Sequence, residues 1–261
     1  MDIFQTNFML EYRPQIFAVF GLLIIIEIVW NRRGGKGVYN FKETAANFFM
    51  YGVLLASKVV LGLYQIWILT LTYDHRLFTI ESNLISFLIV FALAEFTYYW
   101  QHRLMHESRP FWAIHLVHHS SPFMNLSTSL RLPWLDPIVQ PLFHLPMIWL
   151  GFHPLLVGSA VLLNLFYQYW LHTEMVPRLG PVEGWLNTPS AHRVHHASNE
   201  IYIDKNYGGV TMIFDRLFGT YQPETEAVRY GVTTGFQGHN PFTIQVIGLW
   251  DLLRGKFNYK G

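Results

Sequence analysis

Long apolar runs constrain the fold of this chain more than any other feature of its sequence. Three of them cover about residues 16–30, 48–73 and 84–100. A helix needs roughly 20 apolar residues to cross the hydrocarbon core of a bilayer, because each residue adds only about 1.5 Å. These runs therefore predict membrane-spanning helices. The first is expected to be an uncleaved anchor, since no small-residue cleavage site follows it.

A fourth apolar region covers residues 138–171 and is interrupted in its middle. Gly151 and Pro154 form turns and divide it into two pieces, and the first piece also contains Pro141 and Pro146. Two short pieces could form a re-entrant hairpin that enters the bilayer and leaves on the same side. We therefore expect an all-α integral membrane protein with about four membrane-embedded helices, one pair of which could be such a hairpin.

Basic residues predict the orientation, because Lys and Arg accumulate in cytoplasmic loops. The loop 31–47 carries four of them, Arg32, Arg33, Lys36 and Lys42. With this loop in the cytoplasm, the third span ends on the cytoplasmic side. Residues 101–137 and 172–261 are then expected to form a cytoplasmic, histidine-rich helical cap, within a single membrane domain over 1–261.

The composition agrees with a membrane protein and excludes several other classes. Charged residues make up only 13% of the chain, against about 25% in typical soluble domains. A net charge of +1 and the lack of a Lys/Arg run argue against nucleic acid as a partner. The chain has no cysteine, which excludes disulfides, thiolate metal ligands and cysteine-bound iron–sulfur clusters.

Three histidine clusters lie beside the apolar runs, in HRLMH (102–106), HLVHH (115–119) and HRVHH (192–196). Residues three and four apart share a helix face, so each cluster aims its rings to one side. One H-x-x-H-H pattern should occur by chance roughly 0.03 times in such a chain, so two copies indicate a function. Because imidazole is the commonest protein ligand of transition metals, the clusters predict a metal centre at a membrane surface.

The number of histidines indicates two metal ions, because eight exceed the four ligands of one tetrahedral site. A zincin protease is excluded because Glu107 after His106 is not followed by the second histidine of H-E-x-x-H. Iron fits best, since imidazole binds it and two ions can share the two-electron activation of dioxygen. We therefore expect a di-iron oxygenase acting on an unactivated lipid C–H bond, which offers no handle for acid–base chemistry.

These clusters resemble the fatty acid hydroxylase/sterol desaturase superfamily of integral-membrane di-iron enzymes. The resemblance covers roughly residues 84–235 and extends to NLSTSLR (125–131), YQYWLHTE (167–174), IDKNYGG (203–209) and DRLFGTY (215–221). It is nearest to the alkylglycerol monooxygenase-like branch, which cleaves ether lipids. The resemblance implies hydroxylation of a lipid carbon with O2, on an ether lipid, a fatty acyl chain or a sterol-like molecule.

The resemblance also adds His172 to the metal ligands. The expected ligands of two iron ions are His102, His106, His115, His118, His119, His172, His192, His195 and His196. The remaining histidines, His75, His144, His153 and His239, are not expected to bind metal. No nucleotide-binding or haem-binding motif is present, so electrons are expected from an external donor. This donor is either tetrahydrobiopterin, as the resemblance to the ether-lipid branch implies, or a redox protein.

Several acidic and polar residues could support the metal ligands. Glu95 lies two helical turns before His102, and intramembrane carboxylates are functional hypotheses by default. We expect it to accept a hydrogen bond from a ligand imidazole, with pairing to a neighbouring helix as the alternative. Asp204 or Asp215 could do the same for a ligand of the third cluster. Glu27 is expected to reach the membrane interface, and Arg131 to lie in a solvated loop or meet a lipid headgroup.

Three alternative functions remain open. A desaturase of the same superfamily would remove a second hydrogen instead of adding a hydroxyl group. A histidine-rich metal transporter, or a membrane cytochrome with paired axial histidines, would need histidines in the middle of its spans. The clusters here lie at the ends of the apolar runs. We therefore favour oxygen-dependent lipid oxidation.

Overall fold

The computed structural model describes residues 12–34, 37–233, 236 and 238–256. Lys36, which entered the orientation argument, lies outside the described residues, as do both ends of the predicted domain. The described chain is built from α-helices and short 3-10 helices, without β-strands, in agreement with the predicted all-α class.

Three helices are long and apolar enough to cross a membrane, as the first three apolar runs predicted. They are α2 (Arg13–Arg32), α3 (Phe41–Asp74) and α4 (Leu84–Glu107). Asn40 begins α3 because its side chain accepts hydrogen bonds from the backbone N–H groups of Lys42 and Glu43. With 34 residues, α3 is about 51 Å long and extends beyond the hydrocarbon core.

The interrupted apolar region forms two short helices, α6 (Asp136–Leu150) and α7 (Pro154–Tyr169). They contain 15 and 16 residues, so each is about 23 Å long and too short to cross a bilayer by itself. The turn between them requires a glycine, because a Cβ atom on Gly151 would lie 2.3 Å from the carbonyl oxygen of Phe78. The predicted division of this region is therefore confirmed.

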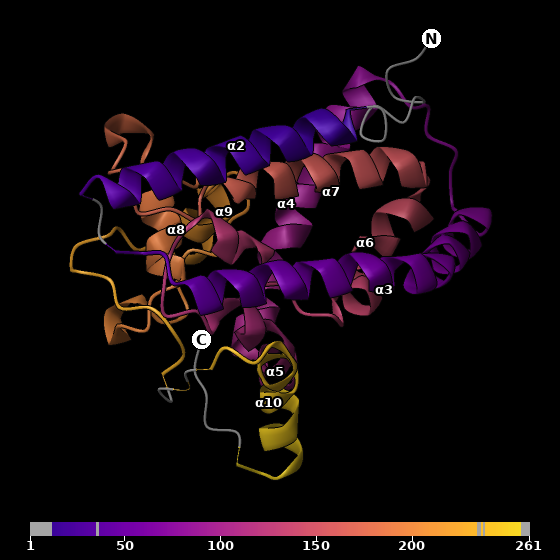
Figure 1. Ribbon diagram of the computed structural model, residues 1–261. Helices are drawn as coiled ribbons and strands as arrows, with labels where there is room; N and C mark the ends of the chain where they lie inside the picture. Colours follow the sequence, from indigo (N-terminus) through magenta and orange to yellow (C-terminus); the bar gives the residue numbers. More distant parts are fainter. Residues whose placement is uncertain (1–11, 35–36, 234–235, 237, 257–261) are drawn as a thin grey trace.

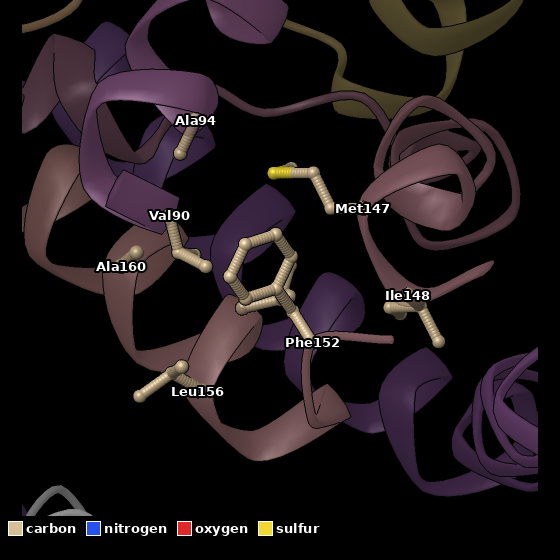
Figure 2. Packing of buried hydrophobic residues seen from close by; sticks show 8 residues of the cluster. Val90, Ala94, Met147, Ile148, Phe152, Leu156 and Ala160 are labelled. Carbon is tan, nitrogen blue, oxygen red and sulfur yellow. The ribbon is translucent and has the colours of Figure 1, made fainter. Parts of the chain in front are cut away.

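The apolar core of the membrane part lies between α4, α6 and α7. Figure 2 shows the Phe152 ring between Val90 of α4 and Met147 of α6. Leu156 and Ala160 of α7 complete this side of the core and are almost fully buried. This packing holds α4 in place, and α4 carries the first two clustered histidines at its C-terminal end.

The remaining elements form the histidine-rich part of the chain. They are α5 (Arg109–His119), η1 (Leu126–Leu130), η2 (Gly180–Val182), α8 (Pro189–His195), η3 (Glu200–Tyr202), α9 (Ile213–Phe218) and α10 (Pro241–Leu253). In Figure 1, α8 and α9 lie at the end of the molecule where α2 ends and α3 begins. Helices α8 and α9 and the basic residues Arg32, Arg33 and Lys42 are therefore at the same end.

Two features differ from the expectations. Glu27 does not reach an interface: it is fully buried and accepts hydrogen bonds from Tyr39 Oη at 2.6 Å, from the backbone N–H of Leu126 at 2.7 Å and from Thr173 Oγ1. Its carboxylate ties α2 to the segments around the site, a role that its isolated position in an apolar run does not reveal. The second difference is α10, which is an apolar helix within the segment 172–261 that was expected to belong to the cytoplasmic cap.

Candidate metal centre

All nine predicted ligands come together in two adjacent groups. In each group, one ligand nitrogen per residue lies within 4.8 Å of all the others. The first group is His102, His106, His115, His119 and His195. The second group is His118, His172, His192 and His196. The rings of His119 and His196 stack at 4.3 Å between centroids, so the two groups share a border.

Helical spacing explains how short segments supply so many ligands. His102 and His106 lie one turn apart at the end of α4, and the spacing of α5 presents its three histidines to both groups. Helix α8 brings His192 and His195, and His172 lies in the turn after α7. Segments far apart in sequence thus converge on one place.

Backbone carbonyls hold several of the rings in place through hydrogen bonds to their Nδ1 atoms. In the first group, Nδ1 of His102 lies 2.9 Å from the carbonyl oxygen of Tyr207, and Nδ1 of His195 lies 3.1 Å from that of Lys205. A neutral imidazole can make this bond only by donating its Nδ1 hydrogen, which leaves a lone pair on Nε2. Such carbonyl acceptors fix the tautomer and the orientation of metal-binding histidines.

The second group has the same arrangement. Nδ1 of His118 lies 3.2 Å from the carbonyl oxygen of Arg131, and Nδ1 of His172 lies 3.1 Å from that of Gln168. Their Nε2 atoms are 3.2 Å apart. Both Nε2 atoms then carry lone pairs, which cannot hydrogen-bond to each other and repel at this distance. A cation between them would remove the repulsion, so these residues fit a metal ion.

The first group contains buried nitrogen atoms that lack a partner within the described part of the chain. They are both ring nitrogens of His106 and the Nε2 atoms of His119 and His195. Buried polar atoms are normally hydrogen-bonded, so a cluster of such exceptions needs an explanation. Metal coordination would satisfy the Nε2 atoms. No Asp or Glu joins either group among the described residues.

Burial keeps these imidazoles neutral. It lowers the pKa of His118 to about 4, and it lowers the pKa values of His115, His192 and His195 well below their ordinary value. Neighbouring histidines lower the last three further, because a second positive charge at this distance would be repelled. At neutral pH the rings therefore offer free lone pairs to a metal.

Glu95 pairs with a neighbouring helix, which was the alternative expectation, and not with an imidazole. Its carboxylate accepts hydrogen bonds from the backbone N–H groups of Val210 at 3.1 Å and Thr211 at 2.9 Å, and from the Asn164 side chain. These hydrogen bonds connect Glu95 to a loop and to α7, and not to an imidazole. Two helical turns correspond to about 10.5 Å along the axis, which takes the carboxylate out of reach of the His102 ring.

The loop 204–211 connects Glu95 to the histidines indirectly. Its backbone presents the carbonyls of Lys205 and Tyr207 to His195 and His102. Asp215 fixes the loop by accepting from the backbone N–H groups of Tyr207 at 2.7 Å and Gly208 at 2.8 Å, so it too lacks the predicted bond to an imidazole. Backbone carbonyls give no signal in a sequence. This explains why Glu95 and Asp215 were expected as acceptors in place of the carbonyls of Lys205 and Tyr207.

Two residues of this loop adopt left-handed backbone conformations. Asp204 and Asn206 both have φ of 59°, a region in which Asn and Asp are enriched. The Asn206 side chain donates to the carbonyls of Ala191 and Gln222 and accepts from the backbone N–H of Gln222 at 2.8 Å. Asn206 therefore ties the loop to α8. The local signal for this role is the left-handed tolerance of Asn.

Arg131 lies in a buried ion-pair network and not in a solvated loop. Its Nη1 atom is 2.8 Å from Oε2 of Glu43 and 3.1 Å from Oδ1 of Asn47, both on α3. Its Nε atom donates to the carbonyl of Val117 and to Ser120 at the end of α5. Since the Arg131 carbonyl also accepts from His118, this residue joins α3 to the second group. Asn125 and Thr128 are buried as well.

The four other histidines lie outside both groups. His239 pairs with Glu43, with Nδ1 2.6 Å from Oε1. His75 hydrogen-bonds to the carbonyl of Leu71, and His153 caps α7 through the backbone N–H of Leu155. His144 is buried in α6.

Comparison with known proteins gives one family and several relatives. The family model described as fatty acid hydroxylase matches residues 87–220, slightly more than half of the chain. An alkylglycerol monooxygenase of Xenopus tropicalis is 44% identical over 158 residues, which make up 60% of this chain and 35% of the relative. The human alkylglycerol monooxygenase is 41% identical over 180 residues, or 69% of this chain and 40% of the relative.

A bacterial relative matches over a longer stretch. The ornithine lipid hydroxylase OlsE of Rhizobium tropici is 28% identical over 228 residues, which cover 84% of this chain and 68% of the relative. The chain spans less than half of the length of the alkylglycerol monooxygenases that it matches. No solved structure matches the chain.

Proposed function

The chain belongs to the fatty acid hydroxylase family, and on this basis we propose that it is a membrane-bound di-iron oxygenase that hydroxylates a lipid C–H bond with O2. One observation carries the proposal: nine imidazoles, eight of them buried, form two adjacent groups, and lone pairs face each other between His118 and His172. An all-nitrogen site for two metal ions agrees with the preference of iron for imidazole.

The proposed ligands of one iron ion are the five histidines of the first group, and those of the other are the four of the second. Bound iron would activate O2 to the oxidant that an unactivated C–H bond requires. The chain holds the rings in place through the carbonyls of Tyr207, Lys205, Arg131 and Gln168. These bonds also keep the Nδ1 hydrogens away from the metal side.

The site excludes bulk water. Every histidine of the two groups except the half-buried His115 is buried. A cavity of about 10 Å³ touches His119 and His196, one from each group, and is lined also by Trp112 and Val232. This volume corresponds to about one water molecule. A cavity of this size cannot hold a lipid chain, which would need another route to the histidines.

The position of the site supports a lipid substrate. His102 and His106 lie at the end of α4, which is apolar and long enough to cross a membrane. A lipid chain in the bilayer could therefore reach the metal centre without crossing water. The names of the relatives refer to alkylglycerols and an ornithine lipid, both amphiphilic lipids. We propose an ether lipid, fatty acyl or sterol-like substrate of this kind.

The proposal also includes the electron donor and the orientation. Tetrahydrobiopterin or a redox protein would supply electrons from outside the chain. Arg32, Arg33 and Lys42 lie at the end of α2 and the beginning of α3. Figure 1 shows α8 and α9 at the same end of the molecule. By the positive-inside rule this end faces the cytoplasm, and the donor would reach it there.

A metal transporter fits the arrangement less well. A relay would need ligands at successive depths through the spans, whereas the nine histidines occupy one compact place at the end of α4. The Nε2 lone pairs of His118 and His172 face each other, and backbone carbonyls fix four of the nine rings. Such rigid, closely spaced ligands favour permanent metal binding over transfer.

Comparative lipidomics would test the function. Cells expressing the wild-type protein, or its His118→Ala variant, would be grown under dioxygen enriched in the heavy isotope of oxygen. We expect a lipid that carries one labelled oxygen atom with the wild-type protein only. A dehydrogenated lipid without label would identify a desaturase. Identical lipid profiles, or a purified active protein without iron, would contradict the proposal.

A further inference from the structure

Helix α10 presents an apolar stripe to the outside of the molecule. Only three of its 13 residues, Thr243, Gln245 and Asp251, are polar. The stripe consists of Phe242 (58% exposed), Val246 (54%), Trp250 (50%) and Leu253 (82%). These positions follow one another at spacings of three and four, so they share one face of the helix. An exposed apolar surface of this kind usually contacts a partner or a membrane.

The opposite face of α10 is fixed on the rest of the chain. A Cβ atom on Gly248 would lie 2.3 Å from Cδ2 of Leu116 and 2.4 Å from the carbonyl oxygen of Ala113, so this glycine allows close packing on α5. The Gln245 side chain accepts from the backbone N–H of Trp134 and donates to the carbonyl of Leu132, both at 2.9 Å. The outward direction of the stripe is therefore set by α5 and the segment before α6.

The stripe continues the apolar surface of a candidate membrane span. The Phe242 ring contacts the ring of Phe49 on α3 with centroids 5.6 Å apart. Phe49 is itself 45% exposed, and further along α3 Val59 is 79% exposed. Since α3 is long and apolar enough to cross a membrane, the exposed apolar side chains of α3 meet the stripe of α10 at the contact between Phe49 and Phe242.

Length and direction fit a helix in the plane of the membrane. With 13 residues, α10 is about 20 Å long, too short to cross the hydrocarbon core. Figure 1 shows that it runs crosswise to α3. At its C-terminal end the Arg254 guanidinium lies 4.1 Å above the Trp250 ring, and both are exposed. Trp and basic residues together are typical of the membrane–water interface.

We propose that α10 is an interfacial helix whose stripe of Phe242, Val246, Trp250 and Leu253 is embedded in the bilayer leaflet that also surrounds the N-terminal half of α3. The exposed side chains of Thr243 and Arg254 then face the lipid headgroups. Helix α5, on which α10 packs, carries His115, His118 and His119. The leaflet contact thus holds the metal-binding helix at the membrane surface. This inference does not depend on the proposed enzymatic activity.

The chain contains no cysteine, so a single introduced cysteine gives one labelling site. Val246→Cys would be labelled with an environment-sensitive fluorophore in phosphatidylcholine nanodiscs, and quenched either by nitroxide-bearing lipids or by aqueous iodide. Val59→Cys on α3 serves as the lipid-facing reference, and Glu226→Cys, an exposed loop position, as the aqueous reference. All three positions are exposed, so substitution should not disturb the fold.

We expect quenching of the Val246→Cys label by the lipid nitroxide, at a depth of about 5–10 Å below the headgroup boundary, and protection from iodide. A label that behaves like that of Glu226→Cys would overturn the proposal. Protection from both quenchers, with crosslinking between two Val246→Cys chains, would also overturn it and assign the stripe to a second copy. Circular dichroism of each variant would verify that the helical content is unchanged.

Discussion

The Nε2 atoms of His118 and His172 face each other at 3.2 Å although the two residues are 54 positions apart in the sequence. Each ring gives its Nδ1 hydrogen to a backbone carbonyl, so neither Nε2 atom has a hydrogen to share. This pair is therefore unfavourable without a cation and favourable with one. It makes metal binding and correct packing of α5 against the turn after α7 parts of the same equilibrium.

Replacing His172 should remove the metal of the second group. In His172→Ala we expect a fall from about two iron ions per chain towards one, with loss of turnover, because three ligands remain in that group. The loss of turnover should exceed the roughly 10–100-fold effect of removing a hydrogen bond that only orients a ligand imidazole. His75→Ala is the matched control, since that exposed ring lies outside both groups. Retention of both irons in purified His172→Ala, measured by mass spectrometry, would exclude this ligand.

Glu95→Gln should loosen the loop that supports the first group. The carboxylate now accepts from the backbone N–H groups of Val210 and Thr211 through one oxygen and from the Asn164 amide through the other. An amide has only one oxygen, so its NH2 group would face one of these donors. A buried mismatch of this kind costs about 1–3 kcal/mol. We expect a lower melting temperature together with weaker iron retention, because the same loop supplies the Tyr207 carbonyl to His102. The exposed Glu81→Gln should change neither property, and equal behaviour of the two variants would contradict the role of Glu95.

The site was largely predictable from the sequence because helical spacing fixes which side chains share a face. His102 and His106, or His115 and His119, need only a helix to come together. The convergence of the clusters needed the superfamily resemblance as well, above all for His172, which stands alone in sequence. The apolar runs predicted the helices in the same way, since their length is set by the thickness of the bilayer.

The groups that support the histidines could not be predicted. Their acceptors are mainly backbone carbonyls, such as those of Tyr207 and Arg131, and a carbonyl is present at every position. Buried charges were also misassigned, because Glu27 and Arg131 find partners far away in the sequence. Residue type alone does not distinguish a paired buried charge from an exposed one.

Gly209→Ala should displace the network around Glu95. A Cβ atom there would lie 2.3 Å from Nδ2 of Asn164, which donates to the Glu95 carboxylate. Overpacking of this kind costs about 1–3 kcal/mol, so we expect a lower melting temperature and reduced iron content. Gly158→Ala is the matched control, because no atom lies within 4 Å of its added Cβ and alanine favours the helix α7. A Gly209→Ala variant as stable as Gly158→Ala would argue against this tight contact.

Acid should destabilise the metal-free protein. The folded state holds His118 with a pKa of about 4, whereas an unfolded histidine has a pKa of about 6.5. The unfolded chain therefore takes up protons first as the pH falls. Stability is fully present above about pH 6.5 and is lost towards pH 4, by about 3 kcal/mol for this histidine alone. Denaturant unfolding across this pH range would measure the loss, which His118→Gln should reduce. Stability that stays constant or rises on acidification would contradict the neutral, buried state of these rings.

Arg131 and Glu43 form a buried ion pair whose two partners should behave very differently when removed singly or together. Arg131→Met leaves the Glu43 carboxylate buried with the His239 ring and the Ser121 hydroxyl as its remaining partners, and breaking such a pair costs about 3–5 kcal/mol. The double variant Glu43→Met/Arg131→Met removes both charges and should recover most of that loss.

The backbone carbonyl of residue 131, which accepts from His118, is present in all variants, so iron binding should follow the stability and not the charge at this position. A thermodynamic cycle of the four proteins measures the coupling. Additive losses would show that the pair contributes no coupling energy, and iron loss in the stable double variant would show a direct electrostatic effect of Arg131 on the second group.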